Sequence, residues 1–170
     1  MSDLLENILF LEKVDIFSSL SIEELSQLAQ IVDTSQYQED EILFRQGDPG
    51  NYAYIILSGK VELFLESGTE GRQTLLSLED GACFGEMALL DGKKRSASAR
   101  ISTESLLARI KRDDFLRVMM RYPTIALGII NQISTRLRNA NQKYREVQKA
   151  IKDLKGFFQN HKNLFNETDE

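Results

Sequence analysis

The sequence has few of the residues on which disulfides and metal sites depend. Its 170 residues include one cysteine, Cys83, and one histidine, His161. A single cysteine cannot form an internal disulfide, and within the apolar run 82–84 it is typical of a small core residue in a reducing compartment. A single histidine argues strongly against a metal-dependent enzyme, because such a site needs a cluster of histidine and carboxylate ligands.

Basic charge and long apolar runs are scarce as well. The chain has 21 Lys and Arg against 26 Asp and Glu, a formal net charge of −5, whereas nucleic-acid-binding domains present a basic face. No apolar run approaches the roughly 20 residues of a membrane span. Residues 1–10 carry acids where a signal peptide carries bases. We therefore expect a cytoplasmic protein that binds neither nucleic acid nor a membrane.

The N-terminal part of the chain predicts helices. Apolar residues within 4–18 follow helical spacing, and Ser21 with Glu24 forms a capping box for a helix that ends near Asp33. The composition, with 42% hydrophobic and 28% charged residues, is ordinary for one soluble globular domain.

From about Ser35 the apolar pattern changes from a helical to a strand period. Short strands are predicted between turns rich in Gly and Asp, at residues 41–46, 53–58, 60–66, 72–78, 98–102 and 106–111. Many short strands at this spacing indicate an antiparallel sandwich or barrel. The expected fold class is therefore mainly β with flanking helices.

The C-terminal part predicts a short helix and then a long one. Asp113 or Asp114 can cap a helix to about Arg121, and Pro123 occupies a favoured first helical position. Apolar residues then alternate steps of three and four, at Ile130, Ile133, Leu137, Ala140, Tyr144, Val147, Ile151, Leu154 and Phe158. One interpretation is a helix that packs on its own domain. The heptad pattern favours the other, a seam between parallel helices of a homodimer.

The segment 84–100 contains the candidate binding residues. Glu86 follows Gly85 at the start of about one helical turn, and Arg95 lies nine residues further on. A guanidinium is a planar fork of donors that suits phosphate oxygens, whereas an ionised carboxylate only accepts and therefore suits a hydroxyl. Each residue alone has an ordinary structural explanation. Together they suit a ligand that has one phosphate and one sugar hydroxyl.

This segment resembles the phosphate-binding cassette of the cyclic-nucleotide-binding domain family. The matching residues are Gly85-Glu86-Met87-Ala88-Leu89, a five-residue gap, and Arg95-Ser96-Ala97. A second family motif of spaced glycines matches residues 43–50, 54–56 and Gly59, and the resemblance covers roughly residues 10–145. Phe44 and Ala53 fall outside the family's usual residues, and Ile101 is bulkier than usual.

The resemblance implies a jelly-roll sandwich and a role for each cassette residue. Arg95 would pair with the cyclic phosphate and Glu86 would accept from the ribose 2′-hydroxyl. The same site would include Gly85, Met87, Ala88, Ser96 and Ala97. Asn141, on the long helix, is the candidate for contact with the base. In a dimer this contact could also reach the base bound by the other subunit. Cyclic AMP is favoured over cyclic GMP, although Ser96 suits either ligand, and no catalytic cofactor is expected.

The implied organisation is a cyclic-nucleotide-binding domain with N-terminal helices at 1–122, a long dimerisation helix at 123–165 and a frayed tail at 166–170. No DNA-reading, channel or catalytic segment is recognised, so we expect a regulatory module, not an enzyme, that signals through its C-terminal helix to an unidentified partner protein. The alternatives are a dimeric scaffold with a vestigial nucleotide site and a metal-dependent enzyme on a similar β fold. The intact Glu86 and Arg95 argue against the scaffold, and the single histidine against the enzyme.

Overall fold

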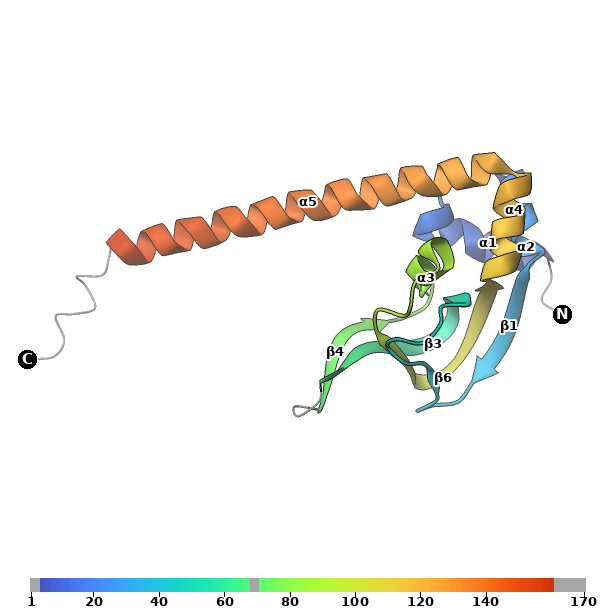
Figure 1. Ribbon diagram of the computed structural model, residues 1–170, viewed down its shortest axis with the longest axis horizontal. Coiled ribbons are helices and arrows are strands. Elements are labelled where there is room, and N and C mark those ends of the chain that lie inside the picture. The colour runs from blue at the N-terminus through green and yellow to red at the C-terminus, as the bar shows by residue number, and fades with distance from the viewer. Residues whose placement is uncertain (1–3, 68–70, 161–170) are drawn as a thin grey trace, which may run out of the picture. The chain divides into compact units, whose positions relative to one another are not determined.

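The computed structural model describes residues 4–67 and 71–160 of the chain. The chain divides into two compact units, residues 1–132 and residues 133–170. The first unit contains all the strands that the structure describes, together with most of the helices (Figure 1).

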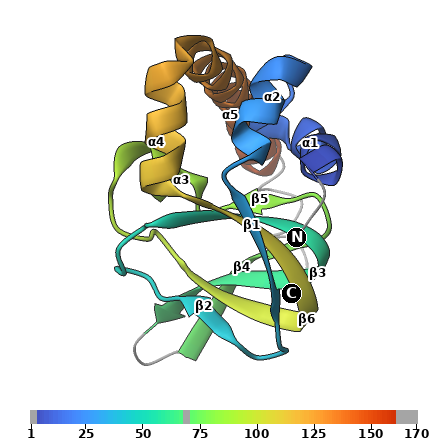
Figure 2. The ribbon, with the colours of Figure 1, turned by 90° about the vertical axis from the view of Figure 1, so that its right-hand side faces the viewer.

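The first unit is built on a six-stranded antiparallel sheet. Its strands are β1 (Val32–Tyr37), β2 (Ile42–Phe44), β3 (Tyr52–Ser67), β4 (Gly71–Leu78), β5 (Cys83–Phe84) and β6 (Ser98–Lys111). They follow the order β1-β6-β3-β4, with β2 also paired to β6 and β5 to β3. The long strands curve around one another, and α1, α2 and α4 gather at one end of them (Figure 2). The predicted class, an antiparallel β fold with flanking helices, is confirmed.

Two of the predicted strand breaks are wrong. Residues 53–58 and 60–66 belong to one strand, β3, which continues through Gly59, and residues 98–102 and 106–111 both belong to β6. Gly59 has a φ of +107°, and a Cβ there would lie 2.1 Å from the Ser105 Oγ of β6. This glycine therefore permits a close approach of two strands and does not end either of them.

The N-terminal helices are α1 (Leu4–Lys13) and α2 (Ile22–Ala29), with a 3-10 turn at Asp15–Phe17 between them. The capping box is confirmed, because Ser21 Oγ accepts from the Glu24 N–H at 3.3 Å and Glu24 Oε2 accepts from the Ser21 N–H at 2.9 Å. The helix ends at Ala29 and not near Asp33, and Val32 starts the unpredicted strand β1.

Three further helices complete the fold. They are α3 (Glu86–Asp91), α4 (Arg112–Arg121) and α5 (Pro123–Asn160). The long helix begins at Pro123 as predicted. For α4 the predicted caps are wrong, because the helix already starts at Arg112, after Lys111, which makes no side-chain cap hydrogen bond.

Two apolar cores hold the first unit together. One packs the N-terminal helices, α4 and the start of α5 against the sheet, and it includes Leu11, Leu28, Phe115 and Ile125. The other fills the sheet interior around the residues Tyr54, Ile56, Val61, Phe84 and Ile101. The candidate cassette is thus attached to both cores, since Leu89 belongs to the first and Phe84 to the second.

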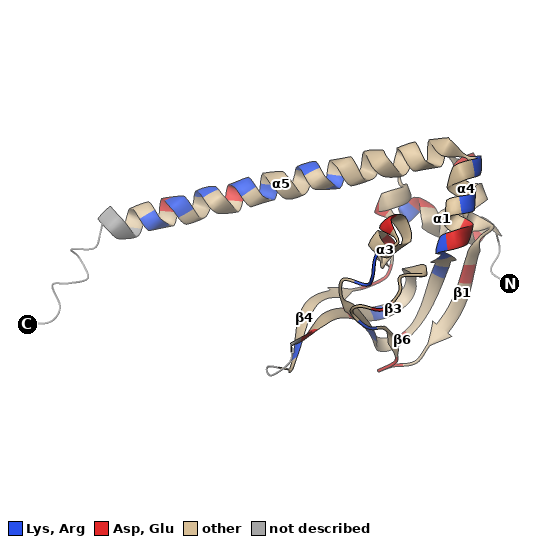
Figure 3. Ribbon diagram, in the orientation of Figure 1, with Lys and Arg blue, Asp and Glu red and all other residues tan. Residues whose placement is uncertain are grey.

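The second unit consists of α5 from residue 133 onward. Its apolar heptad residues are exposed: Ile133, Leu137, Tyr144, Val147, Ile151 and Leu154. Charged residues are absent from 123–135 but frequent beyond, where residues 133–160 contain seven Lys and Arg and two Asp and Glu (Figure 3). The Phe158 side chain, residues 161–165 and the predicted tail 166–170 lie outside the described residues. No helix in the described part of the chain is long and apolar enough to cross a membrane.

Candidate functional site

Two glycines in the left-handed conformation shape the cassette backbone. Gly85, with a φ of 72°, turns the chain from β5 into α3, and Gly92, with a φ of 68°, ends that helix. Glycine takes this conformation without the steric cost that other residues meet. A Cβ at Gly85 would also lie 2.4 Å from Arg95 Nη1. Gly85 therefore serves both the turn and the close approach of the arginine.

The second glycine motif packs directly on the cassette. The Arg95 N–H donates to the Asp48 carbonyl at 2.9 Å, and the Gly47 N–H donates back to the Arg95 carbonyl at 2.9 Å. Gly50 is buried against α3, where a Cβ would lie 2.0 Å from the Ala88 Cβ. The two motifs found in the sequence are thus parts of one structure.

The Arg95 side chain is held on several sides. It is only 5% exposed, its Nη1 donates to the Gly85 carbonyl at 3.0 Å and its Nη2 donates to the Tyr52 carbonyl at 2.6 Å. Its guanidinium carbon lies 4.0 Å from the centroid of the Phe44 ring. The buried Nε has no hydrogen-bond partner among the described residues.

Arg95 is a buried cation that forms no ion pair with the residues that the structure describes. Within the described part of the chain no carboxylate lies within 4.0 Å of its guanidinium, whereas several other arginines form such pairs. Burial lowers the pKa of Arg95, and the acidic groups of Tyr54, Asp48 and Glu86 partly oppose that shift from longer range. An arginine remains protonated even so. The site therefore presents a positive charge that is not neutralised by an ion pair.

A cavity of about 370 Å³ adjoins Arg95. All seven cassette residues named from the sequence line it: Gly85, Glu86, Met87, Ala88, Arg95, Ser96 and Ala97. Glu86 is half-buried, and its carboxylate has no hydrogen-bond partner among the residues that the structure describes. Asn141 is an exposed residue of α5 in the second unit, and its contact with a base stays a prediction.

The apolar part of the cavity lining was not identified from the sequence. It comes from Phe44 and from the β3–β4 hairpin, through Leu63, Leu76 and Leu78. Leu76 and Leu78 are two residues apart and share one face of β4. This alternation was visible in the sequence, but it does not distinguish the wall of a cavity from ordinary core.

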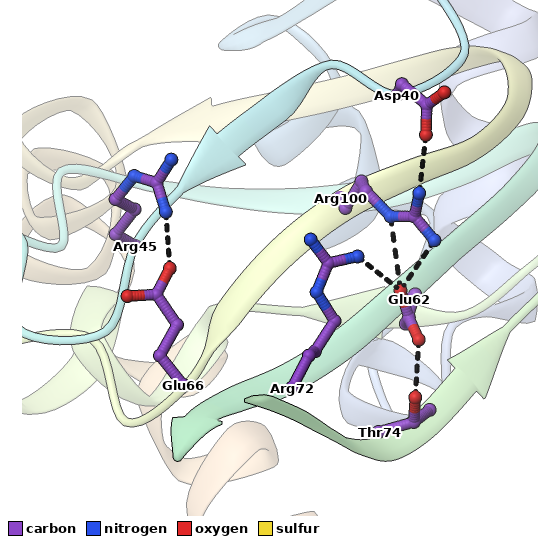
Figure 4. Close-up of polar contacts among 7 residues, drawn as sticks. All are labelled: Asp40, Arg45, Glu62, Glu66, Arg72, Thr74 and Arg100. Carbon is purple, nitrogen blue, oxygen red and sulfur yellow. Dashed lines mark hydrogen bonds and ion pairs between the residues drawn. The ribbon is translucent and has the colours of Figure 1, made fainter. Parts of the chain in front are cut away.

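A cluster of charged groups joins the strands that carry this wall (Figure 4). Glu62 of β3 accepts from Arg100 Nη2 of β6 at 2.9 Å, lies 3.5 Å from Arg72 Nη1, and accepts from the Thr74 hydroxyl of β4. The Asp40 carboxylate pairs with Arg100 on the other side. The Thr74 bond, ahead of the bonds and charge of Arg100, holds the pKa of Glu62 below its usual value. The cluster thus connects β3, β4 and β6 beside the strand position of Leu63.

Comparison with known proteins gives a consistent result. The family model of the cyclic nucleotide-binding domain matches residues 34–122. A cAMP-dependent protein kinase regulatory subunit of Emericella nidulans is 41% identical over 110 residues, which are 65% of this chain and 26% of that protein. The cyclic AMP receptor protein of Thermus thermophilus is 35% identical over 126 residues, 74% of this chain and 58% of that protein. The chain thus spans about a quarter of the length of the kinase regulatory subunit and somewhat more than half of the length of the receptor protein.

Solved structures are similar as well. A cyclic nucleotide-binding-like protein from Brucella abortus matches with a TM-score of 0.61 and 35% identity, covering 68% of this chain and 98% of that one. The catabolite activator protein of Thermus thermophilus matches with a TM-score of 0.66 and 33% identity, covering 79% of this chain and 63% of that one. The predicted jelly-roll fold is confirmed by these matches.

Proposed function

Since the chain belongs to the cyclic nucleotide-binding domain family, we propose that it is a regulatory module that binds a cyclic mononucleotide, cyclic AMP in preference to cyclic GMP. The observation that carries this proposal is the buried charge of Arg95 beside a cavity, with no ion pair to any residue that the structure describes. Burying a cation without an anion is costly. A phosphate placed against Arg95 would remove that cost, and the release of this free energy favours binding.

The proposed roles follow the chemistry of the lining residues. Arg95 donates two of its five N–H groups to backbone carbonyls and keeps others for the cyclic phosphate. Glu86 has a free acceptor for the ribose 2′-hydroxyl, and the exposed Ser96 offers a hydroxyl at the same cavity. The apolar wall of Leu63, Leu76 and Leu78 suits the flat face of a base.

The preference for cyclic AMP and the regulatory role are supported by the relatives. Two of them are named as a cAMP-dependent protein kinase regulatory subunit and a cyclic AMP receptor protein. These names describe control proteins, and we propose that this chain likewise binds its ligand without transforming it.

We further propose that α5 forms a parallel homodimer and signals to a partner protein. Support comes from the apolar heptad residues, which are exposed along the second unit while the residues around them are polar or charged. Burying this apolar line against a second copy would be favourable by the hydrophobic effect. Asn141, beside that line, is the proposed contact to the base.

Calorimetry tests the binding proposal. Wild-type protein is titrated with cyclic AMP, cyclic GMP and linear 5′-AMP, and we expect the tightest binding for cyclic AMP. Arg95→Ala should weaken binding roughly tenfold to a hundredfold, the value of a hydrogen bond to a charged group. Arg95→Lys should restore only part of the affinity, because an ammonium lacks the planar fork.

The control for this titration is Arg45→Ala, since Arg45 is an exposed arginine paired with Glu66 and absent from the cavity lining. It should bind like wild type. Unchanged affinity in a folded Arg95→Ala would refute the role of Arg95. A wild-type protein that binds none of the three nucleotides would favour the dimeric scaffold with a vestigial site.

A further inference from the structure

The ring of Phe44 lies against the face of the Arg95 guanidinium, 4.0 Å from its central carbon. We propose that Phe44 is a positioning residue, which holds Arg95 in the orientation in which it binds the anionic group of the ligand. The inference rests on the proposed function and assigns a specific interaction to a residue whose type differs from those usual at its position in the family motif.

The hydrogen bonds of Arg95 restrain its guanidinium within the plane of the group but not against tilting out of that plane. The carbonyls of Gly85 and Tyr52 accept from the edge of the guanidinium, so they fix its position within its own plane. The Nε–H, which could have supplied a third fixed point, has no hydrogen-bond partner among the described residues. Tilting out of the plane is therefore opposed mainly by what covers the face of the group, which is the Phe44 ring at 4.0 Å, with the Tyr54 ring farther away at 5.9 Å.

Strand pairing and aromatic packing keep the ring in place. β2 pairs with the start of β6, where Phe44 is opposite Ala99, so the ring comes beside the chain that has just left Arg95. The Phe44 centroid lies 5.9 Å from that of Tyr54 and 6.2 Å from that of Phe84. Tyr54 and Phe84 are stacked on each other at 5.4 Å. These separations are typical of stabilising aromatic pairs.

The electrostatics explain why an aromatic ring suits this position. The face of a phenyl ring is negative, and it attracts a cation most strongly where water is excluded. Arg95 is buried and has no carboxylate within ion-pair distance in the described part of the chain. An aliphatic side chain of similar size would fill the same space but would not attract the charge.

The test separates the ring's charge distribution from its shape. Phenylalanine carrying one, two, three or five fluorine atoms is placed at position 44 by nonsense suppression, and cyclic AMP is titrated by calorimetry. Fluorine withdraws electron density from the ring face while nearly preserving its size. Affinity should fall stepwise with fluorination, by roughly three- to thirtyfold in all, the range of cation–π interactions. The affinity of Phe44→Leu should fall at least as far.

Phe64 provides the matched control. Phe64 belongs to β3 of the same sheet, and the Arg72 guanidinium carbon lies 4.2 Å from the centroid of its ring. Phe64 does not line the cavity. Fluorination at position 64, and Phe64→Leu, should leave the affinity for cyclic AMP unchanged. Should Phe44→Leu fail to fold, the fluorinated series still decides, because it retains the packing.

A ligand-free measurement keeps this inference distinct from the proposed function. The Arg95 Nε–H resonance, assigned by its loss in Arg95→Lys, should be shifted by the ring current of Phe44 and should move toward the exposed-arginine value in Phe44→Leu. If wild type binds cyclic AMP and fluorination changes neither affinity nor this resonance, the positioning role is overturned while the function stands. If fluorination tightens binding, Phe44 opposes the ligand and the inference is also overturned. If wild type binds no cyclic nucleotide, the proposed function fails and the resonance alone decides whether Phe44 holds Arg95.

Discussion

Among single residues, Glu86 offers a test of which part of the ligand the cavity recognises. Its carboxylate lines the cavity without a hydrogen-bond partner in the described structure, and an ionised carboxylate can only accept. Glu86→Gln keeps the shape and one acceptor but removes the charge. We expect it to reduce affinity for cyclic AMP several-fold more than affinity for 2′-deoxy cyclic AMP, measured by calorimetry. Equal losses for the two ligands would make Glu86 a structural residue of α3.

Gly50 is required for the contact between the two glycine-bearing segments. A Cβ there would lie 2.0 Å from the Ala88 Cβ, a distance that forces α3 or the loop to move. Gly50→Ala should therefore lower both the melting temperature and the affinity for cyclic AMP. Gly71→Ala is the comparison, because Gly71 has a φ of +83° and open space around it. It should cost about 1 kcal/mol of strain and leave the affinity unchanged.

The sequence predicted the cassette residues but not all of their partners. Arg95 and Glu86 were identified because their residue types and spacing suit a phosphate and a hydroxyl. The stacking of Phe44 on Arg95 was not identified, since it depends on the pairing of β2 with β6 across about fifty residues of chain. No local pattern around Phe44 contains that information.

At the scale of elements, local signals gave correct boundaries where local interactions decide them. The start of α2 depends on Ser21 and Glu24, three residues apart, and it was predicted correctly. The length of β3 depends on Gly59 fitting against Ser105, which is a contact between distant residues. A glycine between two apolar runs indicates a turn from sequence alone, so the single long strand could not be recognised.

The charged cluster around Glu62 makes a prediction about pH. The pKa of Glu62 is lowered in the folded protein. The carboxylate therefore stabilises the fold at pH values above its unfolded pKa of about 4.3. This stabilisation is lost as the pH falls through the folded pKa. Glu62→Gln should lower the free energy of unfolding at pH 7 and flatten its decline below about pH 4.3, measured by urea titration across pH 3–7. The comparison is Glu66→Gln, whose partner Arg45 is exposed and contributes little. Parallel pH curves for wild type and Glu62→Gln would show that the cluster does not stabilise the sheet.

At the scale of the whole molecule, charge differs sharply between the two units. Residues 1–132 contain 13 Lys and Arg and 21 Asp and Glu, whereas residues 133–170 contain eight and five. The net charge of −5 is therefore the sum of a negatively charged first unit and a positively charged second unit. The heptad pattern identifies which face of α5 is apolar, and the burial of that face depends on a second copy of the chain only in the proposed homodimer. The homodimer consequently stays a prediction.

Sedimentation tests that dimer. Val147→Asp combined with Ile151→Asp places charge on the apolar line and should yield monomers that still bind cyclic AMP through the first unit. Asn139→Asp combined with Gln142→Asp adds the same charge away from that line and should remain dimeric. A wild type that is monomeric at micromolar concentration, with and without cyclic AMP, would show that the heptad residues do not join two copies.

The pairing of β6 also determines when the chain can fold. Among the described residues β6 is the last strand, and it supplies the partner for β1, β2 and β3, which precede it by up to about eighty residues. Sheets dominated by such distant pairings fold slowly, on the scale of milliseconds to seconds, because long loops must close first. On a ribosome, β4 and β5 can pair with β3 before residue 98 has emerged, whereas β1 and β2 must wait for β6. The nascent chain must therefore carry unpaired strand edges until β6 has been made, and these are the surfaces on which aggregation begins.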